Sequence, residues 1–237
     1  MSTHIKRKRV VIVASAFLIL VTVLHLLLTN FSPFHRVKSV QVVQACLTPG
    51  GVCHEAVLYD GVITGSGVSK VKALLESRPI RLLCLNSQGG QNSAGRALIA
   101  LIRDKNLQTC LANHYYSKDP NQLISRPTSC MSLCAYVFTS GRDPVIWGNT
   151  DLWVHRTGLW VMGLVRVDIP DSWFRMSVGY LYGDMDAQLP AVAQYLYDES
   201  LAYPFSTYYR MKAISGETLL AHGYIADLKT TAEAIAL

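Results

Sequence analysis

From Glu55 onward, the spacing of apolar residues switches repeatedly between two patterns. Runs rich in β-branched apolar residues predict strands, and segments whose apolar residues recur every three or four positions predict helices. Strands are expected at 56–64, 80–86 and 107–112, with helices at 68–77 and after the polar stretch 87–95. Strands that alternate with helices in this way are typical of an α/β fold with parallel strands.

The second half of the chain is less regular. The uncharged stretch that follows Cys130 predicts a buried helix that ends at Gly141. The segments 114–129 and 156–190 predict a polar loop and an irregular, aromatic region. Short strands are expected at 145–147 and 151–155, and helices at 191–202 and within 214–223, with a last strand before 227.

The N-terminus differs from the rest in charge and hydrophobicity. Nineteen residues, Val10 to Leu28, carry no charged side chain, and at about 1.5 Å per residue they would cross a bilayer of about 30 Å as one helix. The basic cluster before them favours a cytoplasmic N-terminus. A cleaved signal peptide is the alternative, but 29–33 has no small-x-small cleavage site. Both alternatives export the rest of the chain.

The sequence therefore predicts four regions and a location. A basic cytoplasmic tail at 1–9 precedes a transmembrane signal anchor at 10–28, a linker at 29–45 and an α/β domain at 46–237. The chain is expected to be a single-pass protein of the inner (cytoplasmic) membrane, with its C-terminal domain in the periplasm or outside the cell.

Composition excludes one class of partner. Hydrophobic residues make up 50% and charged residues 16%, enough apolar material for a large core. The net charge is +6, and four of the positive charges lie in the tail at 6–9. No basic stripe with interleaved aromatic residues is present, so nucleic-acid binding is not expected.

Six cysteines would lie in a compartment that permits disulfides. Cys46 and Cys53 bracket the turn sequence LTPGGV and are candidates for one disulfide. The spacing of Cys110 with His114, followed by Cys130 and Cys134, resembles a zinc site, but an oxidising compartment works against free thiolates. We therefore expect neither a metal nor a cofactor.

Ser132 lies between Cys130 and Cys134, and His155 follows 23 residues later. A serine before an apolar helix is, on its own, most often a helix cap. The order of LYDGVITG, LCLNSQGG, CMSLCAYVFTSG, NTDLWVHRTG and ISGETLLAHGYIAD, however, resembles the proteolytic subunit of the Clp protease and its exported relatives in the Clp/crotonase superfamily, over about 55–227. The Cys-x-Ser-x-Cys motif resembles a small exported subgroup. The resemblance implies a spiral of β-β-α units with a mostly parallel sheet.

The resemblance also implies roles for individual residues. Ser132 would be the nucleophile and His155 the general base. The backbone N–H groups of Gly89 and Leu133 would form the oxyanion hole, because acyl transfer needs donors aimed at the developing negative charge. The loop that contacts substrate would consist of Asn86, Ser87, Gln88 and Gly90.

Two departures from the family pattern affect these roles. Gln88 replaces the usual proline of the loop, and no acidic residue stands near Met211, where the third member of the triad would fall. Three alternatives follow for His155: a Ser–His dyad, an acid such as Asp198 that reaches in from elsewhere, or orientation by a backbone carbonyl or a hydroxyl such as Ser206.

The sequence thus predicts an exported, membrane-anchored serine hydrolase of the peptidase type, which acts on a peptide or protein and, by family analogy alone, forms a homo-oligomer. A catalytically inactive Clp-like module that binds peptide or protein is the alternative, motivated by the missing acid. A Ser–Lys peptidase similar to signal-peptide peptidase A ranks third, because lysines are sparse in the domain and a histidine occupies the expected place.

Overall fold

The computed structural model describes residues 20, 37–46, 52–117, 123–125, 129–156, 158–161, 165–183, 188–203 and 211–229. Apart from Leu20, the predicted tail and membrane anchor lie outside the described residues. Within the described part of the chain, no helix is both long enough and apolar enough to cross a membrane.

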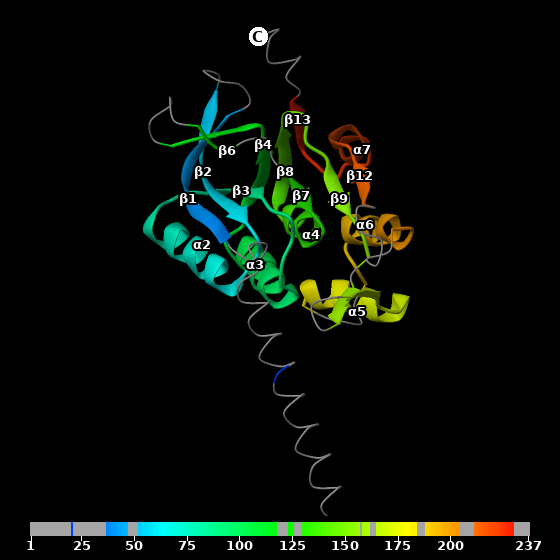
Figure 1. The fold of residues 1–237 in the computed structure, drawn as a ribbon. Helices are drawn as coiled ribbons and strands as arrows, with labels where there is room; N and C mark the ends of the chain where they lie inside the picture. The colour runs from blue at the N-terminus through cyan, green and yellow to red at the C-terminus, as the bar shows by residue number, and fades with distance from the viewer. Residues whose placement is uncertain are drawn as a thin grey trace, which may run out of the picture.

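A curled, mostly parallel sheet forms the centre of the molecule (Figure 1). Its strand order is β13-β8-β4-β3-β2-β1-β5-β6. Strands from β13 to β2 run parallel, whereas β1, β5 and β6 pair antiparallel at one edge. The strands are β1 Val37–Cys46, β2 Cys53–Gly61, β3 Leu82–Asn86, β4 Gln108–Ala112, β5 His114–Tyr116, β6 Leu123–Ser125, β8 Arg142–Trp147 and β13 Asp227–Lys229.

A smaller sheet lies beside the carboxyl end of β3. It has the order β12-β9-β7, with β7 at Cys130–Met131, β9 at Leu152–Val154 and β12 at Lys212–Ile214. A parallel bridge between Ser87 and Cys130 joins it to the end of β3. The candidate nucleophile therefore follows a strand that continues from the main sheet.

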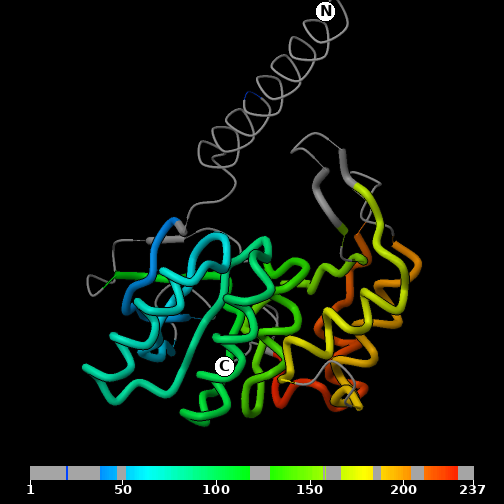
Figure 2. Tube along the Cα trace, turned by 90° about the horizontal axis from the view of Figure 1, so that it is seen from below, coloured from blue at the N-terminus to red at the C-terminus, as the bar shows by residue number. Residues whose placement is uncertain are grey.

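The helices form two groups that contact each other (Figures 1 and 2), since Asn92 Nδ2 of one group donates to Ser177 Oγ of the other at 2.7 Å. Helices α2 (Gly65–Ser77) and α3 (Asn92–Asp104) lie together near β1–β3. Helices α5 (Asp171–Leu181), α6 (Ala191–Leu201) and α7 (Gly216–Ala221) lie on the side of β9 and β12. Between the two groups lies α4 (Leu133–Phe138), all six of whose residues are buried. This burial explains its uncharged sequence.

Strand β1 occupies residues 37–45 of the segment that we expected to be a linker, so these residues belong to the main sheet. It pairs with β2 along its length, from Val37 opposite Gly61 to Cys46 opposite Cys53. It also buries Val43 and Ala45, which alternate on one face of the strand. A strand of this kind depends on its partners β2 and β5, which local sequence does not reveal.

Two segments expected to lack regular structure contain elements. The 114–129 loop contributes β5 and β6, and 156–190 contains a hairpin of β10 (Gly158–Val161) and β11 (Val165–Asp168) followed by α5. The expectation for 156–190 is therefore wrong. Helix α5 buries Phe174, Val178 and Leu181, a helical spacing that the surrounding glycines and aromatic residues obscured.

All six cysteines form disulfides, Cys46–Cys53, Cys84–Cys110 and Cys130–Cys134, and none is free. The first is the pair that the turn sequence suggested. The other two disulfides contain Cys110, Cys130 and Cys134, three of the residues of the zinc-like spacing. Disulfide-bonded cysteines have no thiolate to offer a zinc ion, so these three are not zinc ligands. Three disulfides are typical of proteins from oxidising compartments.

Candidate functional site

Ser132 connects β7 to α4 in a strained conformation. Its backbone angles are φ 55° and ψ −123°. A non-glycine residue with positive φ is uncommon, and such a conformation costs about 1–3 kcal/mol, so the surrounding structure must hold it. The Ser132 N–H donates to the Trp153 carbonyl at 2.6 Å, and the Ser132 carbonyl accepts from the Ala135 N–H at 3.0 Å. The backbone of the turn is therefore hydrogen-bonded to β9 through the Ser132 N–H and to α4 through the Ser132 carbonyl.

The hydroxyl of Ser132 does not cap its helix. Thr64 and Ser215 hold the equivalent positions before α2 and α7, and their hydroxyls accept hydrogen bonds from Gly67 N–H and Thr218 N–H. Ser132 makes no such side-chain bond to α4, every residue of which the structure describes. The ordinary explanation for a serine at a helix start therefore does not account for Ser132.

Gly89 abuts the nucleophile turn. Its φ is +101°, and a Cβ added to it would lie 3.1 Å from both the Met131 carbonyl oxygen and Ser132 Cβ, and 3.3 Å from the Leu133 nitrogen. Only a glycine allows this approach without displacing the turn. The structure thus brings together three of the predicted site residues: Ser132, Leu133 and Gly89.

The Gly89 peptide is fixed by its neighbours. Its carbonyl accepts from the Ile63 N–H at 2.8 Å. Its N–H donates to Ser87 Oγ at 3.1 Å, so this candidate oxyanion donor already has a partner. Leu133 is the first residue of α4, and the first N–H groups of a helix have no partner within the helix.

The remaining loop residues have different surroundings. Ser87 is buried, and its backbone bonds to Ser129 and Met131 at 2.7 and 2.9 Å, which ties the loop to the strand before Ser132. Gln88 and Gly90 are exposed. The Gly90 backbone packs on Ile63, whose carbonyl oxygen would lie 2.2 Å from an added Cβ. Gln88 is therefore the loop side chain most open to a substrate.

Asn86 connects the loop to a buried acid that the sequence did not single out. Its Nδ2 donates to Asp60 Oδ1 at 3.2 Å, and its Oδ1 accepts from the Ser129 N–H at 3.0 Å. Burial raises the pKa of Asp60, and nearby Lys38 offsets part of this rise. In the sequence, Asp60 lies within the strand expected at 56–64, and no motif marks it as a site residue. In the structure, Asp60 and Asn86 support the strand that leads into Ser132.

His155 follows β9, the strand next to β7. The two strands run parallel, with Met131 opposite Trp153, so the chain continues from them to Ser132 and to His155 at the same end of the sheet. His155 is 9% exposed, and its Nδ1 lies 2.5 Å from the Arg156 carbonyl oxygen. Because a carbonyl oxygen can only accept, this contact places the proton on Nδ1 and the basic lone pair on Nε2. That tautomer suits a general base.

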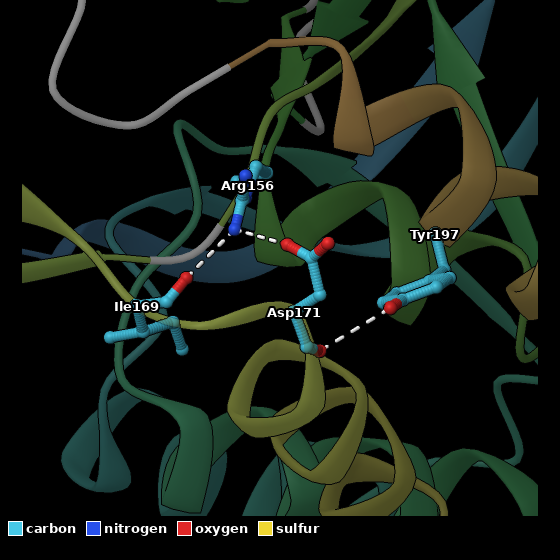
Figure 3. Close-up of polar contacts among 4 residues, drawn as sticks. All are labelled: Arg156, Ile169, Asp171 and Tyr197. Carbon is cyan, nitrogen blue, oxygen red and sulfur yellow. Dashed lines mark hydrogen bonds and ion pairs between the residues drawn. The ribbon is translucent and has the colours of Figure 1, made fainter.

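The residue that supplies this carbonyl is anchored at several points, none of which the sequence indicated. Figure 3 shows the Arg156 guanidinium between the Ile169 carbonyl, at 2.8 Å, and the Asp171 carboxylate, with which it forms an ion pair. The Arg156 N–H donates to the Tyr203 carbonyl at 2.9 Å. Tyr197 in turn donates to the Asp171 carbonyl at 3.3 Å. Arg156 therefore links β9 to α5.

The three alternatives for orienting His155 now differ in support. Strand β12 pairs Lys212 with Val154, and the preceding residue, Met211, continues toward His155, so a non-acidic residue does stand near the position expected for an acid. Asp198 is exposed on α6, where it accepts from Gln194 Nε2 at 2.8 Å. Ser206 lies outside the described residues. The backbone carbonyl is the alternative that a described contact supports.

Comparison with solved structures identifies proteins of the same fold. A serine-to-alanine mutant of the 1510-N membrane-bound stomatin-specific protease has a TM-score of 0.50 and 14% identity, over 73% of this chain and 77% of that one. A lysine-to-alanine mutant of the same protease, in complex with a substrate peptide, has a TM-score of 0.51 and 13% identity over 76% of each chain. No family model and no curated protein matches the chain.

At such identities the likeness establishes a shared fold and not a shared activity. That fold, a curled and mostly parallel sheet with flanking helices, is the one that the resemblance to the Clp/crotonase superfamily predicted.

Proposed function

We propose that the chain is a serine hydrolase of the peptidase type, with Ser132 as nucleophile and His155 as general base. The observation that carries the proposal is the strained Ser132 turn packed against Gly89, with a hydroxyl that does not cap its helix. Strained backbone of this kind persists only where the surrounding structure holds it, and it is concentrated at active sites.

In the proposed reaction, Ser132 Oγ attacks the carbonyl carbon of a peptide bond while His155 Nε2 takes the hydroxyl proton. The oxyanion accepts a hydrogen bond from the Leu133 N–H. It accepts a second from the Gly89 N–H, once the Gly89 N–H has released Ser87 Oγ. The imidazolium then gives its proton to the leaving amine. A water, deprotonated by the same imidazole, hydrolyses the acyl-enzyme.

The orienting group in this proposal is the Arg156 carbonyl rather than a carboxylate. It fixes the tautomer of His155 through Nδ1 as an acid would. A neutral carbonyl stabilises the imidazolium less than a charged carboxylate does, because only the latter carries a full negative charge. We therefore expect slow hydrolysis.

A peptide or protein is the proposed substrate, in keeping with the neighbouring fold that was solved with a substrate peptide. We further propose, from the sequence, that residues 10–28 anchor the protein in the inner membrane and that the domain lies outside the cytoplasm as a homo-oligomer. The three disulfides support the location of the domain.

An inactive binding module is the second candidate. It is favoured by the hydrogen bond that engages the Gly89 N–H and by the absence of an acid at Met211. A Ser–Lys mechanism would need a lysine in place of His155. Lys212, on the strand that pairs with β9, is the described lysine to test, although its Nζ lies 3.8 Å from the Glu199 carboxylate.

A fluorophosphonate probe, which reacts with activated serines, separates these candidates. Full-length protein in detergent would be compared with Ser132→Ala, His155→Ala and Lys212→Met. Ser140→Ala is the matched control, because Ser140 follows the same helix and its hydroxyl donates to the Val137 carbonyl. We expect the probe to label the wild type, Lys212→Met and Ser140→Ala. We expect no labelling of Ser132→Ala or His155→Ala. Labelling that survives in Ser132→Ala would overturn the proposal.

A further inference from the structure

We infer that the Cys130–Cys134 disulfide is a positioning device that holds Ser132 in its strained, reactive conformation. The inference rests on the proposed function, which it extends. The disulfide spans four positions in sequence and encloses Met131, Ser132 and Leu133. It joins the first residue of β7 to the second residue of α4, and both cysteines are fully buried.

The turn needs such a constraint because a relaxed alternative exists. A serine before a helix ordinarily takes an extended backbone, and its hydroxyl then caps the helix, as Thr64 and Ser215 do here. Ser132 holds the same position with φ 55° and no cap bond. Relaxation would turn the proposed nucleophile into an ordinary cap and would move its Oγ from the site.

Hydrogen bonds restrain mainly the strand side of the turn. The Met131 N–H donates to the Ser87 carbonyl at 2.9 Å, and the Ser132 N–H donates to Trp153. On the helix side, Ser132 is joined through its carbonyl to Ala135, a bond that an ordinary cap residue would also make. The disulfide is a second covalent link between the two sides, in addition to the backbone, and it closes a short ring around the strained residue.

The Cys84–Cys110 disulfide offers a matched control. Its cysteines are equally buried, but they lie opposite each other in the paired strands β3 and β4, which the sheet already aligns. It also spans 26 positions rather than four, so its removal should reduce global stability more, because closing a longer loop restricts the unfolded chain more. Removing Cys84–Cys110 should therefore lower stability more, and removing Cys130–Cys134 should lower the reactivity of Ser132 more.

The test compares Cys130→Ala/Cys134→Ala with Cys84→Ala/Cys110→Ala in the full-length protein. Inactivation by a fluorophosphonate at several concentrations gives kinact and KI, and thermal unfolding gives Tm. We expect kinact to fall about tenfold or more in the first variant with KI nearly unchanged, a size that the strain of one such residue can account for. The control variant should keep the wild-type kinact and show the lower Tm.

Equal kinact in the wild type and the first variant would overturn the inference, and so would an equal fall in both variants. A second pair, Cys130→Ala with Cys134→Val, fills more of the space should the alanine pair not fold.

A crystal structure of the folded variant tests the inference without activity. We expect φ of residue 132 to turn negative and its hydroxyl to cap α4, whereas an unchanged positive φ would contradict us. If the wild type is not labelled at all, the proposed function fails and this structure alone decides the role of the disulfide.

Discussion

Gly89 and Gly183 have nearly the same φ, +101° and +104°, but different surroundings. A Cβ on Gly183 would meet no atom within 4 Å, whereas one on Gly89 would press on the Ser132 turn and the Leu133 nitrogen. Substitution by alanine at the two positions therefore separates backbone strain from the loss of the site.

We predict that Gly89→Ala displaces the residue 89 N–H from the site, because the new Cβ presses on the Ser132 turn. The rate of fluorophosphonate labelling should then fall by about 10²–10³, the usual effect of losing one oxyanion donor. Gly183→Ala should leave the rate unchanged and reduce stability by about 1 kcal/mol, because alanine also disfavours positive φ. Rates from labelling time courses and unfolding free energies from urea titrations would check both. Similar rates for the two variants would contradict the role assigned to Gly89.

Asp60 gives a prediction on pH. Burial raises its folded-state pKa above the ordinary value of 3.8, so the group favours folding below that value, and this contribution is lost as pH rises through the raised pKa. Asp60→Asn removes the titration and keeps the oxygen that accepts from Asn86. Relative to this variant, the wild type should become less stable as pH rises through that window. Urea unfolding at a series of pH values measures the difference, and a constant difference would contradict it.

At the scale of residues, site residues were predictable where they lie within a short sequence motif. Ser132, Gly89 and Leu133 lie in contiguous motifs, and the structure brings these three together. Asp60 and Arg156 were missed because they act through partners 26 and 15 positions away, Asn86 and Asp171, and nothing local marks such contacts.

At the scale of elements, the connection from β9 to α5 determines how His155 is held. Arg156 follows β9, and its guanidinium pairs with Asp171 in the first turn of α5 (Figure 3). Its carbonyl contacts His155 Nδ1. Movement of α5 would therefore reach the proposed base through one residue.

We predict that Asp171→Asn lowers kinact for the fluorophosphonate several-fold and changes its pH profile, while KI and Tm stay close to wild type. The small effect on Tm follows because exposed ion pairs contribute about 0–1 kcal/mol, and Asp171 is 65% exposed. Glu76→Gln, which breaks the exposed Lys72–Glu76 pair, is the control and should change neither kinact nor its pH profile. An unaltered pH profile in Asp171→Asn would show that this anchor does not act on His155.

Elements with strong periodicity were predictable, and those that depend on a distant partner were not. The apolar run before Asn86 became the buried strand β3, and 191–202 became α6. Strand β1 and the short strands β5 and β6 exist through pairing with each other and with β2. In α3, Ala94, Leu98, Ile99 and Ile102 are buried, because α2, α4 and α5 all pack on this helix and together cover more than one narrow stripe.

For the whole molecule, the three disulfides join different parts of one domain. Cys46–Cys53 closes the β1–β2 hairpin, Cys84–Cys110 crosses the centre of the sheet, and Cys130–Cys134 encloses the nucleophile turn. A disulfide that closes a longer loop restricts the unfolded chain more, so we expect the contributions to global stability to follow the lengths of the closed loops.

We predict that removing Cys84–Cys110 costs about 3–4 kcal/mol and removing Cys130–Cys134 about 2 kcal/mol, from loops closed over 26 and four positions. Denaturant unfolding of the two double-alanine variants measures both values. The reverse order would mean that local packing, rather than restriction of the unfolded chain, decides their effect.

The central claim is that Ser132 is the nucleophile of a site whose oxyanion donors are the Gly89 and Leu133 N–H groups. A crystal structure of the fluorophosphonate-treated protein tests it most directly. We expect phosphorus on Ser132 Oγ and a phosphoryl oxygen about 2.7–3.1 Å from both nitrogens, with Ser87 Oγ displaced from Gly89. Phosphorus on another residue, or an unmodified Ser132 in protein exposed to excess probe, would contradict it.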